Sequence, residues 1–292
     1  KLTIAVIPKG TTHEYWKTLH AGAEEAGKKY NVDIIWKGPL KEDDRAGQIQ
    51  VVQDFVAQGV SGIVLAPLDD QALVGPVKQA DAHHVPVVII DSALKAEAGK
   101  DYVSFVATDN EKGGEMGGEE LARLLNNKGK VVLLRYAEGS ASTQEREQGF
   151  LNAIKKHPDI QVISDNRYGE ATVDTAKTAA MNMMDVLKQA NGIFTPNEST
   201  TVGMLLALRE AGMAGKVKFV GFDQTPPLID ALKTNELQAL VAQDPFNMGY
   251  KGVETMVRHI KGEKVDLRID TGVHLITGEN LSTPEIQKLL NH

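Results

Sequence analysis

Short apolar runs alternate along the chain with longer stretches in which apolar residues recur every three or four positions. The first run is LTIAVI, and the first helix-like stretch follows it near residues 15–30. Short, almost wholly apolar strands separated by helices of ten or more residues are typical of parallel sheets covered on both faces. The pattern therefore predicts an α/β protein.

The same alternation continues through most of the chain. The expected strands are LTIAVI, VDIIW, GIVLAP, VPVVIID, the run at 103–106, KVVLLR, IQVISD, GIFTP and VKFVGFD, with a β-like run VDLRID near the end. The expected helices lie near 15–30, 44–58, 71–83, 112–126, 144–156, 172–189, 200–210 and 248–260.

These strands are too many for one open sheet, so the sequence predicts two doubly wound parallel-sheet domains. The strand–helix series restarts near Asp109, where the first crossing between domains is expected. The N-terminal α/β domain is predicted to comprise 1–108 plus 243–267, and the C-terminal α/β domain 109–242 plus 268–292. No Gly/Ser-rich linker marks a crossing, which indicates a hinge of strand-like segments in place of a flexible tether.

Composition narrows the possible functions. Of the 292 residues, 42% are hydrophobic and 24% charged, as in soluble globular proteins. The net charge of −7 is mild, so no nucleic-acid partner is expected. No apolar run approaches the ~18–20 residues of a membrane span. The sequence begins at Lys1, so the lack of a signal segment carries no information about the compartment.

Motifs for cofactors and catalysis are missing from the sequence. There is no cysteine, and therefore no disulfide, thiolate metal site or cysteine nucleophile. The dinucleotide, phosphate-loop, zinc-protease, EF-hand and serine-hydrolase motifs are also absent. The sequence predicts no cofactor, no metal and no catalytic residue. It specifies no enzyme, and a protein that is not an enzyme is expected, although an enzyme with an unfamiliar site stays open.

Polar and aromatic residues follow directly after the apolar runs. In open parallel sheets, ligands bind beyond the carboxyl ends of the strands. Carboxylate, guanidinium and carboxamide groups can each bridge two neighbouring hydroxyls, and aromatic rings suit the C–H face of a sugar. These residues predict a site for a polyhydroxylated small molecule. The candidate ligand-binding residues are Lys9, His13, Tyr15, Trp16, Asp91, Ser92, Arg146, Asn197, Asp223 and Gln243.

Each candidate also has a purely structural interpretation. A carboxylate after a strand could cap the next helix, as at Asp223, and Arg146 could form a surface ion pair with Glu145 or Glu147. Asn197 could be a helix cap, and one of the two aromatic residues could belong to the core. The run KEDDR at 41–45 is expected to be an exposed cap, and the two histidines at 83–84 are expected to be solvated.

Taken in order, several segments resemble the type I periplasmic solute-binding proteins of the ribose-binding kind, the receptors of ABC sugar importers. The segments are YWKTLHAGA, VAQGVSGIVLAP, VPVVIID, STQEREQGF, IFTPNE, VGFDQTP, and LVAQDP followed by MGYKGVE. The resemblance runs almost end to end. It implies two α/β domains joined by a three-segment hinge, closure of these domains around a sugar, and delivery of that sugar to a membrane permease.

The resemblance also implies roles for individual residues. Tyr15 and Trp16 fall on the stacking aromatics, and His13 falls on a binding Asn. The hydroxyl-binding groups of the family fall on Asp91, Arg146, Asn197, Asp223 and Gln243. Ser92 stands where the ribose binders have Arg, and Ala171 where they have an aromatic. The segment around Lys9 is similar to the autoinducer-binding relatives, in which this Lys touches ligand. These departures put ribose itself in doubt.

The resemblance further implies a periplasmic or extracytoplasmic protein, with or without a lipid anchor, that acts as a monomer. Three alternatives stay open at this stage. One is the ligand-binding core of a lac-repressor-type regulator, another an autoinducer-type sugar-derivative receptor. The third is an enzyme on a doubly wound fold.

Overall fold

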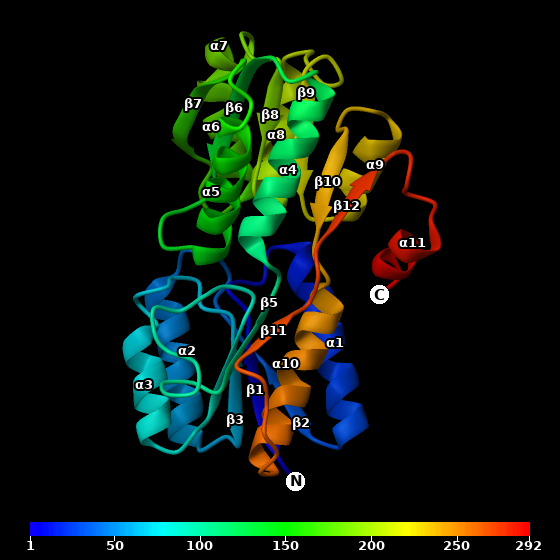
Figure 1. Ribbon diagram of the computed structural model, residues 1–292. Coiled ribbons are helices and arrows are strands. Elements are labelled where there is room, and N and C mark those ends of the chain that lie inside the picture. The colour runs from blue at the N-terminus through cyan, green and yellow to red at the C-terminus, as the bar shows by residue number, and fades with distance from the viewer. The chain divides into compact units, whose positions relative to one another are not determined.

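The computed structural model describes residues 1–292 and contains two six-stranded sheets (Figure 1). The contacts within the chain divide it into two compact units. Unit one comprises Lys1–Thr108, Gly139–Ser142 and Asp244–Gly272, and unit two comprises Asp109–Glu138, Thr143–Gln243 and Val273–His292. Each unit contains one of the sheets, which are parallel except for one edge strand, and helices alternate with the strands. The predicted α/β fold class is confirmed.

Unit one contains the sheet β11-β5-β4-β3-β1-β2, and all of its strand pairs are parallel. Its strands are β1 (Thr3–Ile7), β2 (Asp33–Trp36), β3 (Gly62–Leu65), β4 (Val87–Ile90), β5 (Ser104–Ala107) and β11 (Arg268–Asp270). Its helices are α1 (Glu14–Tyr30), α2 (Arg45–Gln58), α3 (Val74–Ala82) and α10 (Pro245–Ile260).

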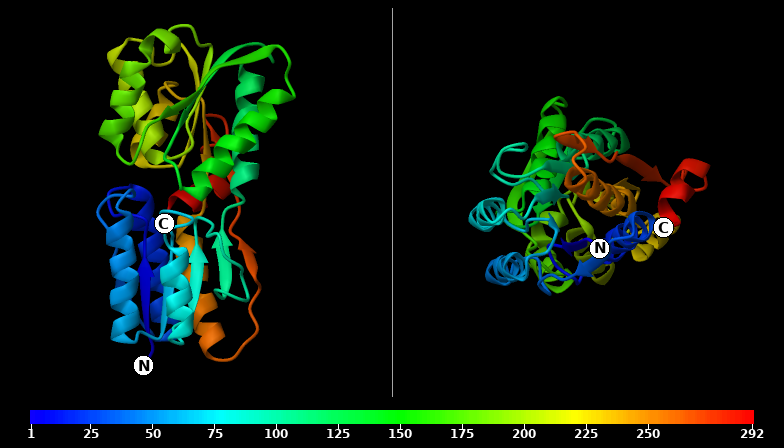
Figure 2. Two further views of the ribbon diagram at one scale, coloured as in Figure 1. Left: turned by 90° about the vertical axis from the view of Figure 1, so that its left-hand side faces the viewer. Right: turned by 90° about the horizontal axis from the view of Figure 1, so that it is seen from below.

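Both faces of this sheet are buried. Ile4 and Val6 point into a core formed with α1 and α10, whereas Ala5 and Ile7 point into a second core formed with α2 and α3. In Figure 2, left, α2 and α3 lie on one side of the strands and α10 on the other. Burial on both faces explains why the strands are almost continuously apolar.

Unit two repeats this arrangement with the sheet β12-β10-β9-β8-β6-β7, in which only β12 runs antiparallel to its neighbour. Its strands are β6 (Gly129–Arg135), β7 (Ile160–Tyr168), β8 (Gly192–Phe194), β9 (Lys218–Phe222), β10 (Ala239–Ala242) and β12 (His274–Thr277). Its helices are α4 (Asn110–Leu124), α5 (Ala141–Lys155, which belongs to this unit from residue 143), α6 (Val173–Asn182), α7 (Met184–Leu187), α8 (Glu198–Glu210), α9 (Pro226–Lys233) and α11 (Pro284–Leu290).

The core of unit two also has two layers. Val132 and Leu134 pack with residues of α6, α8 and α9, and Val131 and Leu133 pack with residues of α4 and α5. Phe150 and Phe194 stack in the second layer with ring centroids 4.6 Å apart. None of the helices in either unit is both long and apolar enough to cross a lipid bilayer.

The structure differs from the sequence-based expectations in several places. The predicted helix at 172–189 is broken at Met183, which leaves the helical conformation (φ −110°, ψ 20°) and is buried in the core. Strand β12 and helix α11 were not predicted. β11 pairs with β5 in the first sheet, although 268–270 were expected in the C-terminal domain. Gln243 was expected in the N-terminal domain and clusters with unit two. The domain boundaries as a whole stay a prediction.

Glycines allow one pair of helices in each unit to pack backbone against backbone. A Cβ atom on Gly22 of α1 would overlap the carbonyl oxygen of Phe246 in α10, and one on Gly114 of α4 would overlap that of Arg146 in α5. These contacts set the distance between the helices, so the side chains that the helices carry are held in fixed register.

We expect Gly22→Ala to lower the free energy of unfolding by about 1–3 kcal/mol, the usual cost of overpacking. Gly75→Ala in α3 is the matched control, because a Cβ there meets no atom within 4 Å. It should be neutral or stabilising by about 0.5–1 kcal/mol, since Ala restricts the unfolded chain. Urea unfolding of the two variants measures both effects. Equal stabilities would contradict the proposed backbone contact.

Candidate functional site

Asp91 is the centre of a polar set in unit one. It follows β4 directly, is 4% exposed and has a left-handed backbone (φ 70°). Its N–H donates to the carbonyl oxygen of Val106 at 3.0 Å, which holds this conformation in place. The Tyr15 hydroxyl donates to its Oδ1 at 2.8 Å. Positive φ is uncommon outside glycine and clusters at functional sites.

Lys9 follows β1 and is 3% exposed. Its ammonium lies 3.8 Å from Asp91 Oδ2 and donates to the hydroxyls of Ser140 and Ser142 at 3.1 Å. The Ser142 N–H in turn donates to Ser92 Oγ at 2.9 Å. Lys9 and Ser92 therefore both bind the segment Gly139–Ser142, which returns from the second part of the chain to unit one.

His13 and Trp16 are brought together by Glu42. Trp16 is 3% exposed and meets the Tyr15 ring edge-on, with centroids 4.9 Å apart. Its indole N–H donates to Glu42 Oε2 at 2.8 Å, and His13 Nδ1 lies 3.1 Å from the same oxygen. The expectation of an exposed cap at 41–45 is wrong for Glu42, which is buried. It holds for Asp44, which accepts from the Gly47 N–H at the start of α2.

Asp223 is the counterpart of Asp91 in unit two. It follows β9, the strand equivalent to β4 in the second sheet, and has φ 78°. Its N–H donates to Val241 at 2.9 Å, just as Asp91 donates to the strand beside it. Its Oδ1 accepts from Gln243 Nε2 at 2.7 Å, and its Oδ2 accepts from the Glu198 N–H at 2.8 Å. It does not cap the next helix, where Thr225 is the N-cap residue.

Arg146 is 3% exposed, so the surface ion-pair interpretation is wrong. Its Nε donates to Asn110 Oδ1 at 3.0 Å, and its Nη1 donates to the carbonyl oxygen of Pro196 at 2.9 Å. The guanidinium also lies over the Phe222 ring, 4.2 Å from the centroid. These partners are neutral and use two of its five N–H groups. The other three N–H groups of the guanidinium take no part in these two bonds.

Asn197 acts as a helix cap. Its Oδ1 accepts from the Thr200 N–H at 3.2 Å and forms a reciprocal capping box with Thr200 at the start of α8. Asn197 is 6% exposed, and its Nδ2 takes no part in these bonds. Both interpretations from the sequence therefore remain compatible with its position.

Glu147, next to Arg146, was not predicted as part of the site. It is 1% exposed, accepts from the Tyr136 N–H at 2.9 Å and lies 3.3 Å from Nη1 of Arg135. Burial raises the pKa of the Glu147 carboxyl to about 7, although the Tyr136 N–H and the guanidinium groups of Arg135 and Arg146 act in the opposite direction. Glu147 anchors the start of α5 to the end of β6.

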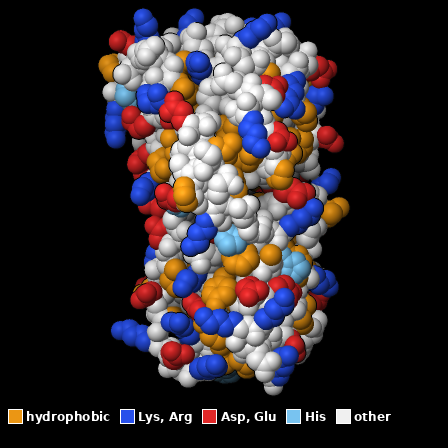
Figure 3. All heavy atoms as spheres, turned by 90° about the vertical axis from the view of Figure 1, so that its right-hand side faces the viewer, with side chains coloured by type: hydrophobic (Ala, Val, Ile, Leu, Met, Phe, Trp, Pro, Cys, Tyr) orange, Lys and Arg blue, Asp and Glu red, His pale blue; other side chains and the backbone are white.

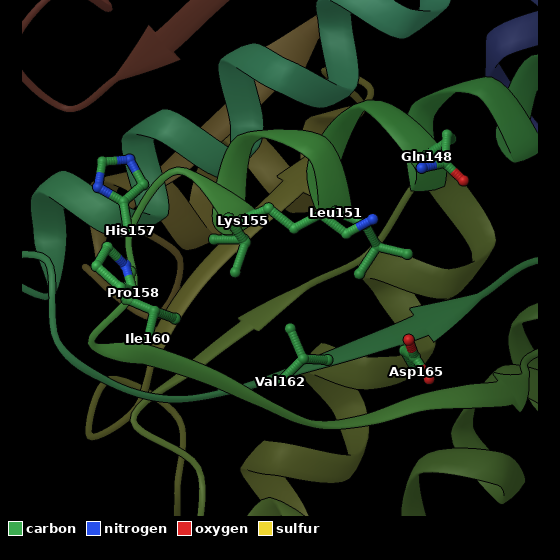
Figure 4. A pocket seen from close by; sticks show the side chains of 9 residues that line it. Gln148, Leu151, Lys155, His157, Pro158, Ile160, Val162 and Asp165 are labelled. Carbon is green, nitrogen blue, oxygen red and sulfur yellow. The ribbon is translucent and has the colours of Figure 1, made fainter.

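A pocket of about 370 Å³ lies elsewhere in unit two, between α5 and β7 (Figure 4). Leu151 and Val162 line it, with Lys155 and Asp165 among its polar residues. It contains none of the predicted site residues. Its interior lacks the convergent buried polar groups that a sugar site needs, so it is not a second candidate.

Comparison of this sequence with known proteins identifies its family. The family described as "Periplasmic binding protein domain" matches residues 4–264 of the chain. The chain is also 30% identical over 280 residues to the ribose import binding protein of Salmonella typhimurium, covering 94% of this chain and 90% of that protein. The chain belongs to the periplasmic binding protein family.

Two solved solute-binding proteins are similar to this protein over almost the whole chain. A carbohydrate transporter solute-binding protein from Agrobacterium radiobacter, in complex with D-arabinose, is 34% identical with a TM-score of 0.95, covering 100% of this chain and 99% of that one. An ABC transporter solute-binding protein from Agrobacterium vitis, with bound D-fucose, is 36% identical with a TM-score of 0.94, covering 98% of each chain.

In this periplasmic binding protein, the predicted site residues form two sets, each within one unit. The first set contains Lys9, His13, Tyr15, Trp16, Asp91 and Ser92, and the second contains Arg146, Asn197, Asp223 and Gln243. Their roles in ligand binding stay predictions. Sequence reasoning missed Glu42 because its charged neighbours suggested a solvated loop. The available signal was Gly10, whose missing side chain lets the loop carrying Glu42 approach.

The raised pKa of Glu147 predicts a pH-dependent stability. The unfolded carboxyl loses its proton near 4.5, the folded one only near 7. Between these values the folded state binds more protons, so the free energy of unfolding falls as pH rises. From pH 5 to 8 the titration of Glu147 should lower the free energy of unfolding by about 2.5 kcal/mol. In Glu147→Gln the carboxamide oxygen can still accept from the Tyr136 N–H, but the side chain no longer titrates. The free energy of unfolding of this variant should therefore change less between pH 5 and 8 than that of the wild type. Urea unfolding at several pH values measures this difference. The same dependence on pH in both proteins would contradict the assignment of the effect to Glu147.

Proposed function

We propose that this periplasmic binding protein is the sugar-binding receptor of an ABC importer. The observation that carries the proposal is the likeness, over essentially the whole chain, to solved carbohydrate-binding receptors with bound D-arabinose and D-fucose. The ribose import binding protein among its relatives supports the same class of activity. The ligand expected here is a monosaccharide or related polyol.

The chemistry of the two sets fits such a ligand. Asp91 and Asp223 are buried carboxylates, and Arg146 is a buried guanidinium with neutral partners. Hydrogen bonds that involve a charged group contribute about 1.5–3 kcal/mol each. Tyr15 and Trp16 add aromatic surface for the C–H face of a sugar. A site of this kind rejects analogues that lack a matching hydroxyl, because its own buried groups would be left unpaired.

We propose that one sugar molecule is bound by both sets, with Asp91 and Asp223 each accepting from its hydroxyls. Ligand contacts with both sets would favour a closed arrangement of the two units over an open one. The same ligand should therefore lose affinity when either set is altered.

The partners follow from the receptor role. We expect delivery of the sugar to a membrane permease, release of the ligand unchanged, and a monomeric receptor in the periplasm or outside the cytoplasmic membrane. No nucleic-acid partner is expected. The net charge of −7 supports this expectation, as does the mixing of Lys and Arg with Asp and Glu over the face shown in Figure 3.

The first test is a thermal-shift screen of pentoses, hexoses and polyols, beginning with D-ribose, D-arabinose, D-fucose and D-tagatose. A ligand present at 100 times its Kd raises the stability of the native state by about 2.7 kcal/mol. A clear rise in Tm with at least one sugar is expected, and calorimetry on the hits gives Kd. A panel without any binding sugar would overturn the proposal.

The second test substitutes the two carboxylates by Asn, which tolerates their positive φ whereas Ala would add strain. We expect Asp91→Asn and Asp223→Asn each to weaken the binding of the same sugar about 10- to 100-fold, since each loses a charged acceptor.

Matched controls are Asp81→Asn and Asp174→Asn, which change the same charge at exposed positions in the same two units. They should alter affinity less than twofold. If Asp223→Asn lowers the free energy of unfolding but leaves Kd unchanged, Asp223 is structural and not a ligand contact.

A further inference from the structure

Two of the crossings of the chain between the units are built alike. In one, β5 is followed by Thr108 and then by Asp109, whose side chain caps α4 by accepting from a backbone N–H at 3.2 Å. In the other, β10 is followed by Gln243 and then by Asp244, which caps α10 in the same way at 3.0 Å. The first residue of each pair ends one unit, and the aspartate begins the other.

A side chain holds the carbonyl group that precedes the first of these crossings. Arg268 lies on β11, which runs parallel to β5, and its Nη2 donates to the carbonyl oxygen of Thr108 at 3.1 Å. Its Nη1 donates to the carbonyl oxygen of Ala107 at 2.9 Å, and the guanidinium lies 4.8 Å from the centroid of the Phe105 ring. Because the guanidinium is planar and its donors point in fixed directions, these contacts together fix the orientation of the Thr108 carbonyl.

A second side chain holds the equivalent carbonyl before the other crossing. Gln224 lies two residues after β9, the strand that runs parallel to β10, and its Nε2 donates to the carbonyl oxygen of Gln243 at 2.7 Å. In both crossings the last carbonyl of a unit is thus bound by a side chain from that same unit, which lies on a neighbouring strand or just beyond its end.

These bonds restrict the backbone on both sides of each crossing. The bound carbonyl fixes the residue before the crossing, and the helix cap fixes the residue after it. Rotation of the backbone is then concentrated at one link in each crossing, 108–109 in the first and 243–244 in the second.

We propose that Arg268 and Gln224 are positioning residues for sugar binding, because they confine the bending of the chain at these crossings to those two links. The proposal rests on the proposed sugar-binding function. Without the two side chains, the ligand-free protein would sample more arrangements at its crossings, and a bound sugar would have to restrain more of them. Neither residue needs to contact the sugar.

The binding experiment measures Kd by calorimetry for those of D-ribose, D-arabinose, D-fucose and D-tagatose that bind the wild type. Arg268→Met removes the donors and should weaken the binding of every such sugar by a common factor, about three- to tenfold. Gln224→Leu should act in the same way. Arg167→Met and Gln161→Leu are the matched controls, because they make the same changes at exposed positions of β7. The controls should alter Kd less than about twofold.

A direct role in recognition would affect one sugar more than another. If Arg268→Met or Gln224→Leu changes the ratio of the Kd values for two sugars more than about threefold, that residue acts at the sugar and not at the crossing, and the inference fails. Wild-type Kd values in both variants would also overturn it, even if the free energy of unfolding falls, because the side chains would then be purely structural.

Hydrogen exchange in the ligand-free protein gives an independent readout. Arg268→Met should speed the exchange of amides in residues 105–113 and leave residues 240–248 unchanged, and Gln224→Leu should do the reverse. A general loss of stability would instead raise exchange throughout the chain. That result, or wild-type exchange rates at both crossings, would overturn the inference.

The outcomes separate the two proposals. A wild-type protein that binds none of the sugars overturns the proposed function, and the role of the two side chains in affinity with it. The exchange measurement needs no sugar and still decides whether they restrain the crossings. If the wild type binds a sugar but the variants keep its affinity and its exchange rates, only the inference about Arg268 and Gln224 fails.

Discussion

One backbone hydrogen bond in each sheet holds a buried aspartate at the end of a strand: Asp91 donates to Val106, and Asp223 donates to Val241. Asp91 follows β4 and Asp223 follows β9, the equivalent strand of the second sheet. The N–H of each donates to the next strand in the chain, β5 or β10. This bond holds the residue after the strand at positive φ, and it fixes the position of the carboxylate at the carboxyl end of the strand. Such a conformation costs energy in any residue except glycine, and the parallel sheet around it supplies the rigidity that maintains it.

Buried charges on this framework need hydrogen-bonding or oppositely charged partners. Removing an ion from water is costly unless hydrogen bonds or an opposite charge compensate. Lys9 is compensated by two serine hydroxyls and Asp91, and Glu42 by His13 and Trp16. Because these partners belong to one unit, contacts within that unit orient the side chains. At the proposed sugar site, this pre-organisation would lower the entropic cost of binding.

The fold was predictable from the sequence because the signals that specify it are local. Burial on both faces makes the strands continuously apolar, which marks them in the sequence. Residues that follow parallel strands lie at the same end of the sheet, so the positions of Asp91 and Asp223 could be predicted. The burial of Glu42 was not predictable, because it depends on close packing between two loops. The loop that carries Glu42 can approach the loop after β1 only because Gly10 has no side chain. β12 and α11 were missed because their residues are only partly buried and lack a clear apolar period.

For the proposed sugar-binding function, the charges of each set favour a neutral ligand. The first set contains the ammonium of Lys9 and two carboxylates, those of Asp91 and Glu42. The second set contains the guanidinium of Arg146 and the carboxylate of Asp223, each hydrogen-bonded to neutral groups. Each set contains at least one carboxylate, so an anionic sugar at the proposed site would meet repulsion in a buried environment where screening is weak. A polyol meets no such penalty. Its hydroxyls can donate to the carboxylates and accept from the guanidinium.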